Sequence, residues 1–376
     1  MAHYCTARII RSRRPALTAL FAAALVAATT GCNRSGGVES VTVVLEDSDG
    51  GKDTTSREDV AQLAKREGEM WWYTSLPQEA AERFLALFRA QHPYLTTHLV
   101  RGSTFDMVQR VQTEIEKGEV HADVLHVLDM AIFSEMRLKG QLLLYASEQE
   151  RSVPAKYKDP GYWSALRVVG LCMAYDSVRL DQAAIPQTWD ELLDERWRGR
   201  IALKDAQTAG SAYAQYYFLR DEYGSHYWES MARQSPRIYK TADESLAALE
   251  TGEVDVVSGA MGYSVSERIK GGSTVRAVWP SDGVPVMLGP VAILRGAPHR
   301  NAGKLFMDFA LSKEGQEALR DLAGIYSVRE DVAPPADRPS LSELKIMSSL
   351  GGWAEYARNQ EALKSEYTGL FHPGSE

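Results

Sequence analysis

The feature that most constrains the fold is a regular alternation of short apolar runs with longer helical segments, which begins near residue 60. The apolar run EMWWYT (69–74) is followed by a helical segment from Pro77. The same order recurs twice, first with THLVRG and FDMVQRVQTEIEKG, then with ADVLHVLD and AIFSEMRLKG. Apolar runs of strand length that alternate with helices predict a parallel sheet with helices on both faces. We therefore expect an α/β protein.

A second unit with the same alternation follows the segment KYKDPGYW. The expected elements are, in order, a strand in RVVGLCMAYDS, a helix and a strand in TWDELLDERWRGRIAL, a helix that begins near Ser211, a helix, a strand and a helix in SLAALETGEVDVVSGAMGYSVSERIKGG, a strand in VPVMLGPVAILRGAP, two helices after it, and a C-terminal helix near GGWAEYARNQEALKSEY. The length of 376 residues and the hydrophobic content of 44% suit one large or two medium domains with a sizeable core.

The first 31 residues resemble a bacterial lipoprotein signal peptide. Four arginines precede the apolar stretch ALTALFAAALVAA, which is too short to span a bilayer as a stable helix, and small residues stand directly before Cys32. We expect cleavage to leave Cys32 as a lipidated N-terminus that anchors a periplasmic or extracytoplasmic protein to a bacterial membrane. The alternative is ordinary secretion with Cys32 removed. Residues 32–59 are rich in Ser, Gly and Asp and are predicted to form a flexible tether.

Charge and motif content exclude several classes of function. Removal of residues 1–31 takes away four arginines and no acidic residue, so the net charge falls from −8 to −12, which argues against nucleic-acid binding. The sequence contains no GxSxG, HExxH, P-loop or GxGxxG motif, so we expect neither an enzyme nor a resident cofactor. We expect His121 and His126 to be surface or strand-edge residues rather than metal ligands, and Cys172 to be a buried core thiol.

Hydroxyl side chains recur where predicted strands end and helices begin. They are Thr74 and Ser75, Ser103 and Thr104, Thr208 and Ser211, and Ser258. In open α/β sheets, ligands bind at the carboxyl ends of the strands, where the N-termini of helices present free N–H groups and the positive end of a dipole. Helix capping alone explains any one of these hydroxyls. Four such junctions across two units favour a binding site.

The chain from about residue 60 to 332 resembles the solute-binding proteins of ABC importers in the ferric-iron, phosphonate and polyamine group. The matching stretches occur in the order found in that group: AKREGEMWWYTSLP, RGSTFDMVQRVQTE, KGEVHADVLHV, GYWSALRVVGLCMAYDS, TWDELLDERWRGRIAL, TAGSAYAQYY, LETGEVDVVSGAMGYS and LGPVAILRGAPHRNAGKLFMDFALSKEGQEAL. The resemblance implies two lobes of the type II periplasmic-binding-protein architecture. It also implies a hinge of two crossovers, near residues 166–172 and 278–288, and a ligand cleft that closes between the lobes.

The resemblance further implies the limits of the lobes and the side chains that face the cleft. Lobe 1 is expected in residues 60–168 with a return segment at 281–322, and lobe 2 in residues 169–280, completed with a C-terminal helix by residues 323–376. The expected cleft residues are Thr74, Ser75, Ser103 and Thr104 from lobe 1 and Thr208, Ser211, Tyr213 and Tyr263 from lobe 2. Neutral hydroxyls and amides suit a small oxyanion, so we expect a phosphonate, a phosphate ester or a carboxylate. Arg101 either adds a counter-charge or is a solvated strand-end residue. An ABC permease and its ATPase are the expected partners of a monomer.

Three alternatives remain open at this point. The first is ferric iron, because iron-binding members use a tyrosine pair in the segment that here reads SGAMGYSV. Gly262 replaces the first tyrosine of that pair, Tyr263 matches the second, and Tyr213 matches a further ligand of some members, so Tyr213 and Tyr263 would bind Fe(III) with a synergistic anion. The second is an enzyme on the same scaffold, for which no perturbed acid or nucleophile is evident. The third is a receptor that reports solute occupancy to a sensor kinase.

Overall fold

The computed structural model describes residues 57–347 and 352–372, which belong to one compact unit, residues 55–376. The predicted signal peptide, Cys32 and most of the predicted tether lie outside the described residues. Within the described ranges, no helix combines the length and the apolar composition that a membrane span needs.

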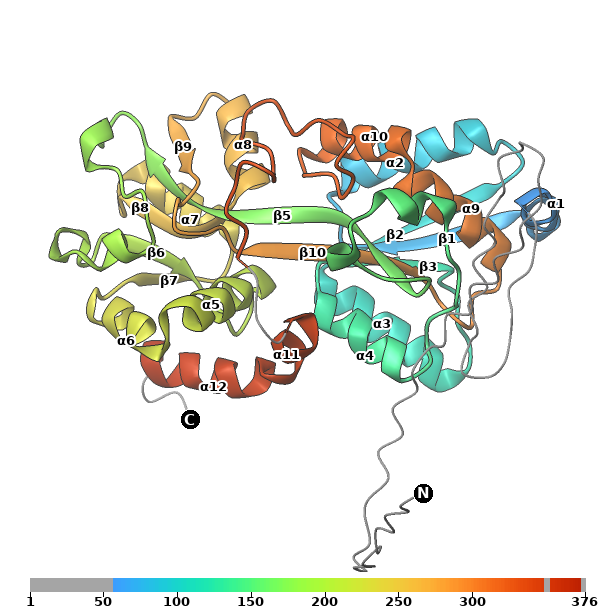
Figure 1. The fold of residues 1–376 in the computed structure, drawn as a ribbon, viewed down its shortest axis with the longest axis horizontal. Coiled ribbons are helices and arrows are strands. Elements are labelled where there is room, and N and C mark those ends of the chain that lie inside the picture. Colours follow the sequence, from blue (N-terminus) through green and yellow to red (C-terminus); the bar gives the residue numbers. More distant parts are fainter. Residues whose placement is uncertain (1–56, 348–351, 373–376) are drawn as a thin grey trace, which may run out of the picture. The chain divides into compact units, whose positions relative to one another are not determined.

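The described strands form one ten-stranded sheet in which the long strand β5 is central (Figure 1). The strands are β1 (Glu69–Thr74), β2 (Thr96–Arg101), β3 (Val124–His126), β4 (Lys158–Asp159), β5 (Trp163–Asp176), β6 (Ile201–Lys204), β7 (Arg237–Tyr239), β8 (Val256–Met261), β9 (Val275–Val278) and β10 (Val286–Ile293). Their order is β2–β1–β3–β10–β5–β8–β6–β7, and β4 and β9 also pair with β5. We call β1–β4, β10 and residues 163–170 of β5 the first half-sheet. The second half-sheet comprises β6–β9 and residues 171–176 of β5.

The predicted parallel pairing is found within each half-sheet, and strands β5 and β10 depart from it. β1 is parallel to β2 and β3, and β6 is parallel to β7 and β8, as predicted. β10 is antiparallel to β3 and β5, and β5 is antiparallel to β8 and β9. The reason is that the chain leaves the first half-sheet through β5 and returns to it through β10, which pairs Val286 with Gly170. These two strands therefore run against their neighbours.

Helices cover both faces of each half-sheet. They are α1 (Arg57–Glu67), α2 (Gln78–Gln91), α3 (Thr104–Lys117), α4 (Met130–Leu138), α5 (Gly210–Tyr223), α6 (Ser225–Arg233), α7 (Ala242–Thr251), α8 (Gly262–Lys270), α9 (Arg300–Leu311), α10 (Lys313–Ala323), α11 (Gly352–Arg358) and α12 (Gln360–Phe371). On the first half-sheet, α2, α9 and α10 lie on one face and α3 and α4 on the other (Figure 1). On the second, Leu171 and Met173 pack with α5 and α6, whereas Cys172 and Ala174 pack with α7 and α8. Cys172 is thus a buried core thiol, as predicted.

Parts of the second unit differ from the predicted elements. The segment TWDELLDER, expected to be a helix, forms two short 3₁₀ turns at Asp190–Leu193 and Glu195–Trp197. Asp194 between them has extended backbone, and its carboxylate accepts a hydrogen bond from Arg196 N at 3.0 Å, so the helical course stops and a new turn begins. Helix α6 and strand β7 follow α5 without having been predicted.

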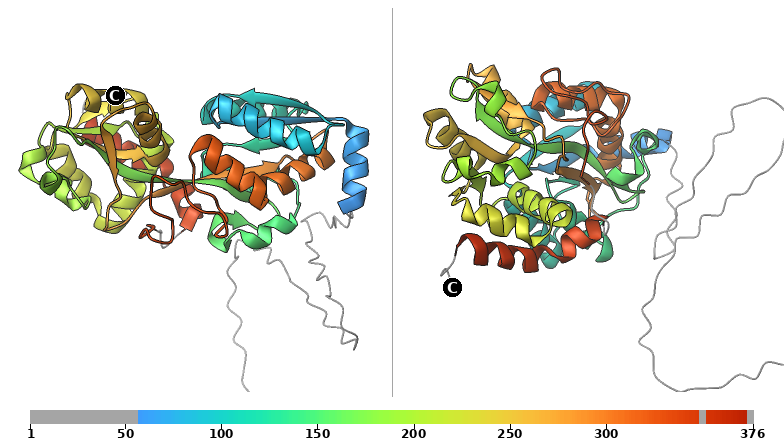
Figure 2. Two further views of the ribbon diagram at one scale, coloured as in Figure 1. Left: turned by 90° about the horizontal axis from the view of Figure 1, so that it is seen from above. Right: turned by 60° about the vertical axis from the view of Figure 1, so that its left-hand side comes forward.

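The C-terminal helices contact elements on both sides of β5. Helix α11 packs on α4, which covers the first half-sheet. Tyr356 of α11 packs against Tyr213 and Tyr217 of α5, which covers the second half-sheet. Helix α12 lies against α5 and α6 (Figure 2). The C-terminal helix that the sequence predicts is therefore a pair of helices.

Candidate ligand-binding site

Arg167 is a buried cation on β5, close to the point where this strand leaves the first half-sheet. Only 2% of its surface is exposed. Its Nη2 donates a hydrogen bond to Ser75 Oγ at 3.3 Å, and its Nε has no hydrogen-bond partner among the described residues. Burial lowers the pKa of Arg167 to about 10, and the titratable groups that act on it are Tyr263 and Arg101, so no described carboxylate neutralises it. A buried cation without a counter-ion is costly, and a bound anion would offset that cost.

Thr74 and Ser75, at the end of β1, differ in their availability to a ligand. Thr74 is completely buried, and its Oγ1 lies 2.7 Å from His126 Nδ1 and accepts a hydrogen bond from Leu76 N at 3.1 Å. Ser75 is half-buried, and its backbone N–H donates to His126 O at 3.0 Å, which holds the residue beside Arg167. Because Ser75 Oγ accepts a hydrogen bond from Arg167, its own proton is free to be donated to a ligand.

His126 is fully buried, so the prediction of a surface or strand-edge position is wrong for this residue. It is the last residue of β3, which lies between β1 and β10 rather than at an edge of the sheet. Burial, and secondly the charge of Arg167, lower the pKa of His126 well below its usual value of 6.5, so the ring is neutral. His126 therefore supports the end of β1 through Thr74 and adds no charge. His121 is exposed, as predicted.

Tyr263 brings the first turn of α8 into the electrostatic reach of Arg167. Its side chain is half-buried, and burial raises the pKa of its hydroxyl although the positive charge of Arg167 opposes that rise. The preceding residue, Gly262, has no room for a tyrosine, because a Cβ there would lie 2.5 Å from Cη2 of Trp279. A tyrosine pair at this position would therefore require Trp279 to move.

A second buried cation lies at the end of β6. Lys204 is 2% exposed, and its Nζ donates a hydrogen bond to Ser211 Oγ at 2.5 Å. Ser211 is in the first turn of α5, whose N-cap residue, Ala209, supplies no side-chain cap. Burial lowers the pKa of Lys204 to about 8, and the other titratable group that acts on it is Cys172, so no described carboxylate neutralises this ammonium either.

The hydroxyl of Ser103 at the start of α3 is engaged in helix capping. Ser103 is exposed, and its Oγ accepts a hydrogen bond from Asp106 N at 3.1 Å and donates one to the Asp106 carboxylate at 2.7 Å. These two residues form a capping box, and Thr104 is the first residue of the helix. Arg101 is exposed and donates to Leu76 O at 3.2 Å. This junction therefore has the structure that capping alone predicts.

Two of the predicted residues from the second unit also have partners within the protein. Thr208 is exposed, and its hydroxyl donates to Asp205 O at 3.4 Å. Tyr213 is completely buried, and its hydroxyl donates to Tyr356 O at 2.8 Å. Burial raises the pKa of Tyr213, which disfavours the phenolate that Fe(III) prefers. Of the eight predicted residues, Ser75 is hydrogen-bonded to Arg167 and Ser211 to Lys204, and Tyr263 is close enough to Arg167 for the two charges to shift each other's pKa. The assignment of all eight as ligand contacts remains a prediction.

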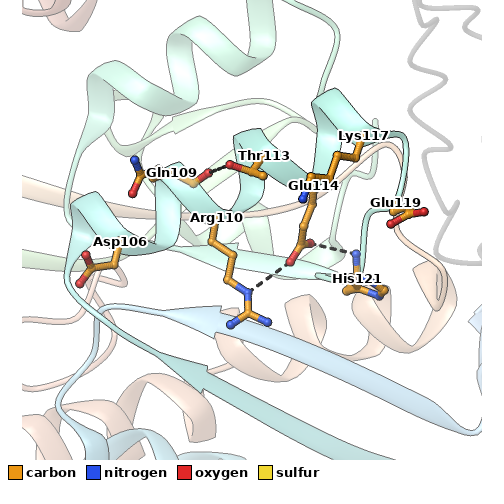
Figure 3. Close-up of a pocket in the computed structure, with 8 residues that line it drawn as sticks. All are labelled: Asp106, Gln109, Arg110, Thr113, Glu114, Lys117, Glu119 and His121. Atoms are coloured by element: carbon orange, nitrogen blue, oxygen red, sulfur yellow. Dashed lines mark hydrogen bonds and ion pairs between the residues drawn. The ribbon is translucent and has the colours of Figure 1, made fainter.

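The hollow drawn in Figure 3 is a separate feature on α3. Its volume is about 410 Å³, and it is lined by Asp106, Gln109, Arg110, Thr113, Glu114, Lys117, Glu119 and His121. Glu114 accepts hydrogen bonds from Tyr73 Oη at 2.8 Å, from Arg110 Nε at 3.3 Å and from His121 N at 2.9 Å. Arg110 is thus paired with Glu114, and the lysine of the hollow, Lys117, is exposed, so neither resembles the buried cation Arg167.

Arg167 and Lys204 are site candidates that the sequence analysis did not identify. Each is a single basic residue within or beside an apolar run, SALRVVGLCM and RIALKD. On sequence alone, such a residue is indistinguishable from one that faces solvent on a half-exposed strand. The distinguishing observation is that helices cover both faces of the sheet, which buries these two side chains.

Comparison with known proteins places this chain among proteins that carry solutes. A family model described as bacterial extracellular solute-binding protein matches residues 125–358. The putative 2-aminoethylphosphonate-binding periplasmic protein of Salmonella typhimurium is 24% identical over 177 residues, which are 44% of this chain and 51% of that protein. The match thus spans about half of the length of that relative.

Two solved structures show the same fold. The periplasmic binding protein AfuA from Actinobacillus pleuropneumoniae, with fructose-6-phosphate bound, has a TM-score of 0.69 and 23% identity, and the match covers 82% of this chain and 99% of AfuA. Iron-bound HitA from Pseudomonas aeruginosa has a TM-score of 0.71 and 19% identity, with 80% and 99% covered. The fold is therefore the α/β periplasmic-binding-protein fold of type II, and the family is one of solute carriers rather than enzymes. With more than half of its length matched by the family model, this chain belongs to the bacterial extracellular solute-binding proteins, the periplasmic components of ABC uptake.

Proposed function

We propose that this protein captures a small anionic solute, namely a phosphonate, a phosphate ester or a carboxylate, and delivers it by lobe closure to an ABC permease and its ATPase. The single observation that supports this proposal most strongly is Arg167, a guanidinium that is 2% exposed and has no carboxylate partner among the described residues. Such a group suits a negatively charged ligand, because burial of an unpaired charge is unfavourable and an anion would compensate it.

The groups around Arg167 suit an oxyanion in particular. Ser75 accepts a hydrogen bond from Arg167 and keeps its own proton for a ligand oxygen. Tyr263 is a second hydroxyl donor, and the rise of its pKa caused by burial keeps its proton in place at neutral pH. Together with the positive end of α8, these groups would hold an anion without a further charged residue.

Ferric iron is the second candidate, favoured by the likeness to iron-bound HitA. The residues that would carry it are Tyr213 and Tyr263, together with a synergistic anion. The hydrogen bond from Tyr213 to Tyr356 O and the steric limit at Gly262 count against this candidate, because neither leaves a tyrosine pair ready to coordinate the metal.

Thermal unfolding of the chain that begins at residue 32 tests the two candidates together. The chain is screened against alkylphosphonates, phosphate esters, di- and tricarboxylates, polyamines and Fe(III)-citrate. An anion at one hundred times its dissociation constant should add about 2.7 kcal/mol to the free energy of unfolding and raise the melting temperature. A response to Fe(III) alone, with a phenolate charge-transfer absorption, would reject the anion proposal in favour of iron.

We further propose that lipid on Cys32 anchors the mature protein to the membrane. The support is the sequence before Cys32, which resembles a lipoprotein signal. In cells, Cys32→Ser should convert the membrane-bound protein into a form released by osmotic shock. Equal membrane association of both forms would contradict the anchor.

A further inference from the structure

We propose that Trp279 is a positioning residue, whose ring fixes the first turn of α8 so that the hydroxyl of Tyr263 faces an anion held at Arg167. Trp279 itself contacts no ligand in this arrangement. The inference rests on the proposed function, because Tyr263 is a ligand contact there. It deepens that function by naming a residue that determines how well the contact is made.

The ring of Trp279 lies against the backbone of two glycines from different elements. Trp279 directly follows β9 and is half-buried. A Cβ at Gly170 of β5 would lie 2.8 Å from Cζ3 of this ring, and a Cβ at Gly262, the first residue of α8, would lie 2.5 Å from Cη2. Such close approaches are possible because glycine has no side chain. The ring therefore sets the separation between β5 and the start of α8.

Tyr326 limits the movement of the Trp279 ring. The two rings meet edge to face, with centroids 6.0 Å apart and an interplanar angle of 72°. Tyr326 is itself anchored at two points, since its carbonyl accepts a hydrogen bond from Val168 N of β5 at 3.1 Å and its hydroxyl donates to Pro339 O at 2.8 Å. The Trp279 ring thus has fixed neighbours, and a closely packed ring of this kind positions the backbone that it touches.

The first turn of α8 connects the Trp279 ring to the face of the sheet where Arg167 lies. Trp279 packs with the core on the α7 and α8 face of the second half-sheet, whereas Tyr263 packs with the core on the α5 and α6 face. Val169 and Leu171 of β5 belong to the latter core, so alternation along the strand turns the side chain of Arg167 to the same face. Tyr263 and Arg167 accordingly influence each other's pKa. A shift of the turn that Trp279 supports would therefore move the Tyr263 hydroxyl relative to Arg167.

Titration calorimetry with methylphosphonate tests the inference on the chain that begins at residue 32. Tyr263→Phe should weaken binding about 10- to 100-fold, the range for one hydrogen bond to a charged group. Trp279→Leu keeps the Tyr263 hydroxyl but misaligns it, and should weaken binding about 3- to 30-fold. In the Tyr263→Phe background, Trp279→Leu should cause no further loss, because two changes that act through one contact are not additive.

Two further variants separate positioning from a general loss of packing. Trp71→Leu is the control, since Trp71 is also half-buried and stacks on His98 of β2 with ring centroids 4.1 Å apart. It should leave the affinity unchanged. Gly262→Ala removes no core side chain and pushes the same turn away from Trp279. It should weaken binding when the Tyr263 hydroxyl is present and have no effect in the Tyr263→Phe background.

A measurement without any anion tests the same arrangement independently of the ligand. The Nε–H resonance of Arg167, assigned by its loss in Arg167→Met, reports the position of the neighbouring tyrosine ring. Trp279→Leu should shift this resonance in the nuclear magnetic resonance spectrum, and Trp71→Leu should not.

The outcomes separate this inference from the proposed function. If Trp279→Leu weakens binding equally with and without the Tyr263 hydroxyl, or leaves the affinity unchanged, Trp279 is a packing residue and the inference is wrong, while the proposed function stands. If wild-type protein binds no methylphosphonate, the result counts against the proposed function, and the Arg167 resonance alone decides the inference: a shift in Trp279→Leu supports it, and an unchanged resonance rejects it.

Discussion

Each half-sheet holds a buried cation against a serine hydroxyl, but the two cations differ in kind and come from different elements. In the first, the charge belongs to Arg167 on the shared strand β5, and the serine belongs to β1. In the second, Lys204 and Ser211 come from consecutive elements, β6 and α5. A guanidinium stays protonated throughout the physiological range, whereas burial brings the pKa of Lys204 to about 8. The cation of the first half-sheet is therefore permanently charged, whereas that of the second can lose its proton near pH 8.

The largest expected effect comes from removal of the permanent charge. Arg167→Met should weaken binding of the best anion by about 2–5 kcal/mol, because it truncates one partner of a buried charged contact. The free energy of unfolding without ligand should stay constant or rise, since the variant removes an uncompensated buried charge. Calorimetry and urea unfolding measure the two quantities.

Arg101→Met is the matched control for this variant. Arg101 also lies near Ser75, because it pairs with Thr74 where β1 and β2 run side by side, but it is exposed and donates to Leu76 O. Its loss should change anion affinity by less than 1 kcal/mol, as expected of an exposed charge. A larger effect at position 101 than at position 167 would reverse the roles assigned to the two arginines.

The next largest effect is a pH dependence of the free energy of unfolding, which Lys204 should cause and Arg167 should not. The pKa of Lys204 is about 8 in the folded protein and near 10.5 when the chain is unfolded, so between these values the unfolded state binds more protons. Stability should therefore rise with pH across this window in wild-type protein, by up to about 3 kcal/mol. Below pH 8 the cost of the buried charge is fully present.

Lys204→Met should lack this rise, because its side chain does not titrate. The measurement is urea unfolding at intervals from pH 7 to 10.5 for both proteins, with the difference between the curves as the readout. Groups other than Lys204 titrate in both proteins and cancel in the difference. Parallel curves would show that Lys204 is not buried as a charge. The contrast between a permanent charge at Arg167 and a titratable one at Lys204 would then be wrong.

The elements were largely predictable from the sequence because strand and helix periods are local properties. EMWWYT and THLVRG form β1 and β2, and the helix from Pro77 is α2. The helix predicted in TWDELLDER does not form because a local carboxylate, that of Asp194, competes with the helix for backbone N–H groups. The antiparallel course of β5 and β10 depends on how the chain returns to the first half-sheet, which no local pattern records.

The site was less predictable than the fold because burial and neighbouring groups decide whether a charged side chain is available to a ligand. Ser75 and Ser211 could be proposed from their places at strand-to-helix junctions, but Ser103 occupies an equivalent place and forms a capping box. Arg167 and Lys204 are candidates for anion binding because each is a buried cation without a described carboxylate partner. That is a property of the packed structure. Sequence reasoning therefore predicts the positions of hydroxyls and misses the cations behind them.

Two serine variants with smaller expected effects distinguish a serine that binds the ligand from one that caps a helix. Ser211→Ala should weaken anion binding by about 1–3 kcal/mol, since Lys204 and the ligand both lose a hydrogen-bond partner. Ser103→Ala should leave affinity unchanged and lower the free energy of unfolding by about 1 kcal/mol, the usual cost of a lost N-cap. Calorimetry measures the anion affinity of both variants, and urea unfolding measures their free energies of unfolding. Weaker binding in Ser103→Ala would return that residue to the site.

The smallest expected effect concerns the buried tyrosine of the second unit. Tyr213→Phe removes the hydrogen bond to Tyr356 O and should lower the free energy of unfolding by about 0.5–1.5 kcal/mol. Anion affinity should not change, because the hydroxyl is completely buried and faces α11. Tyr263→Phe, in contrast, should weaken anion binding while it leaves this hydrogen bond intact. Absorption spectra with added Fe(III) complete the test: a visible band lost in both variants would make the two tyrosines equivalent iron ligands, whereas no band in wild-type protein would leave Tyr213 as a packing residue and Tyr263 as the ligand contact.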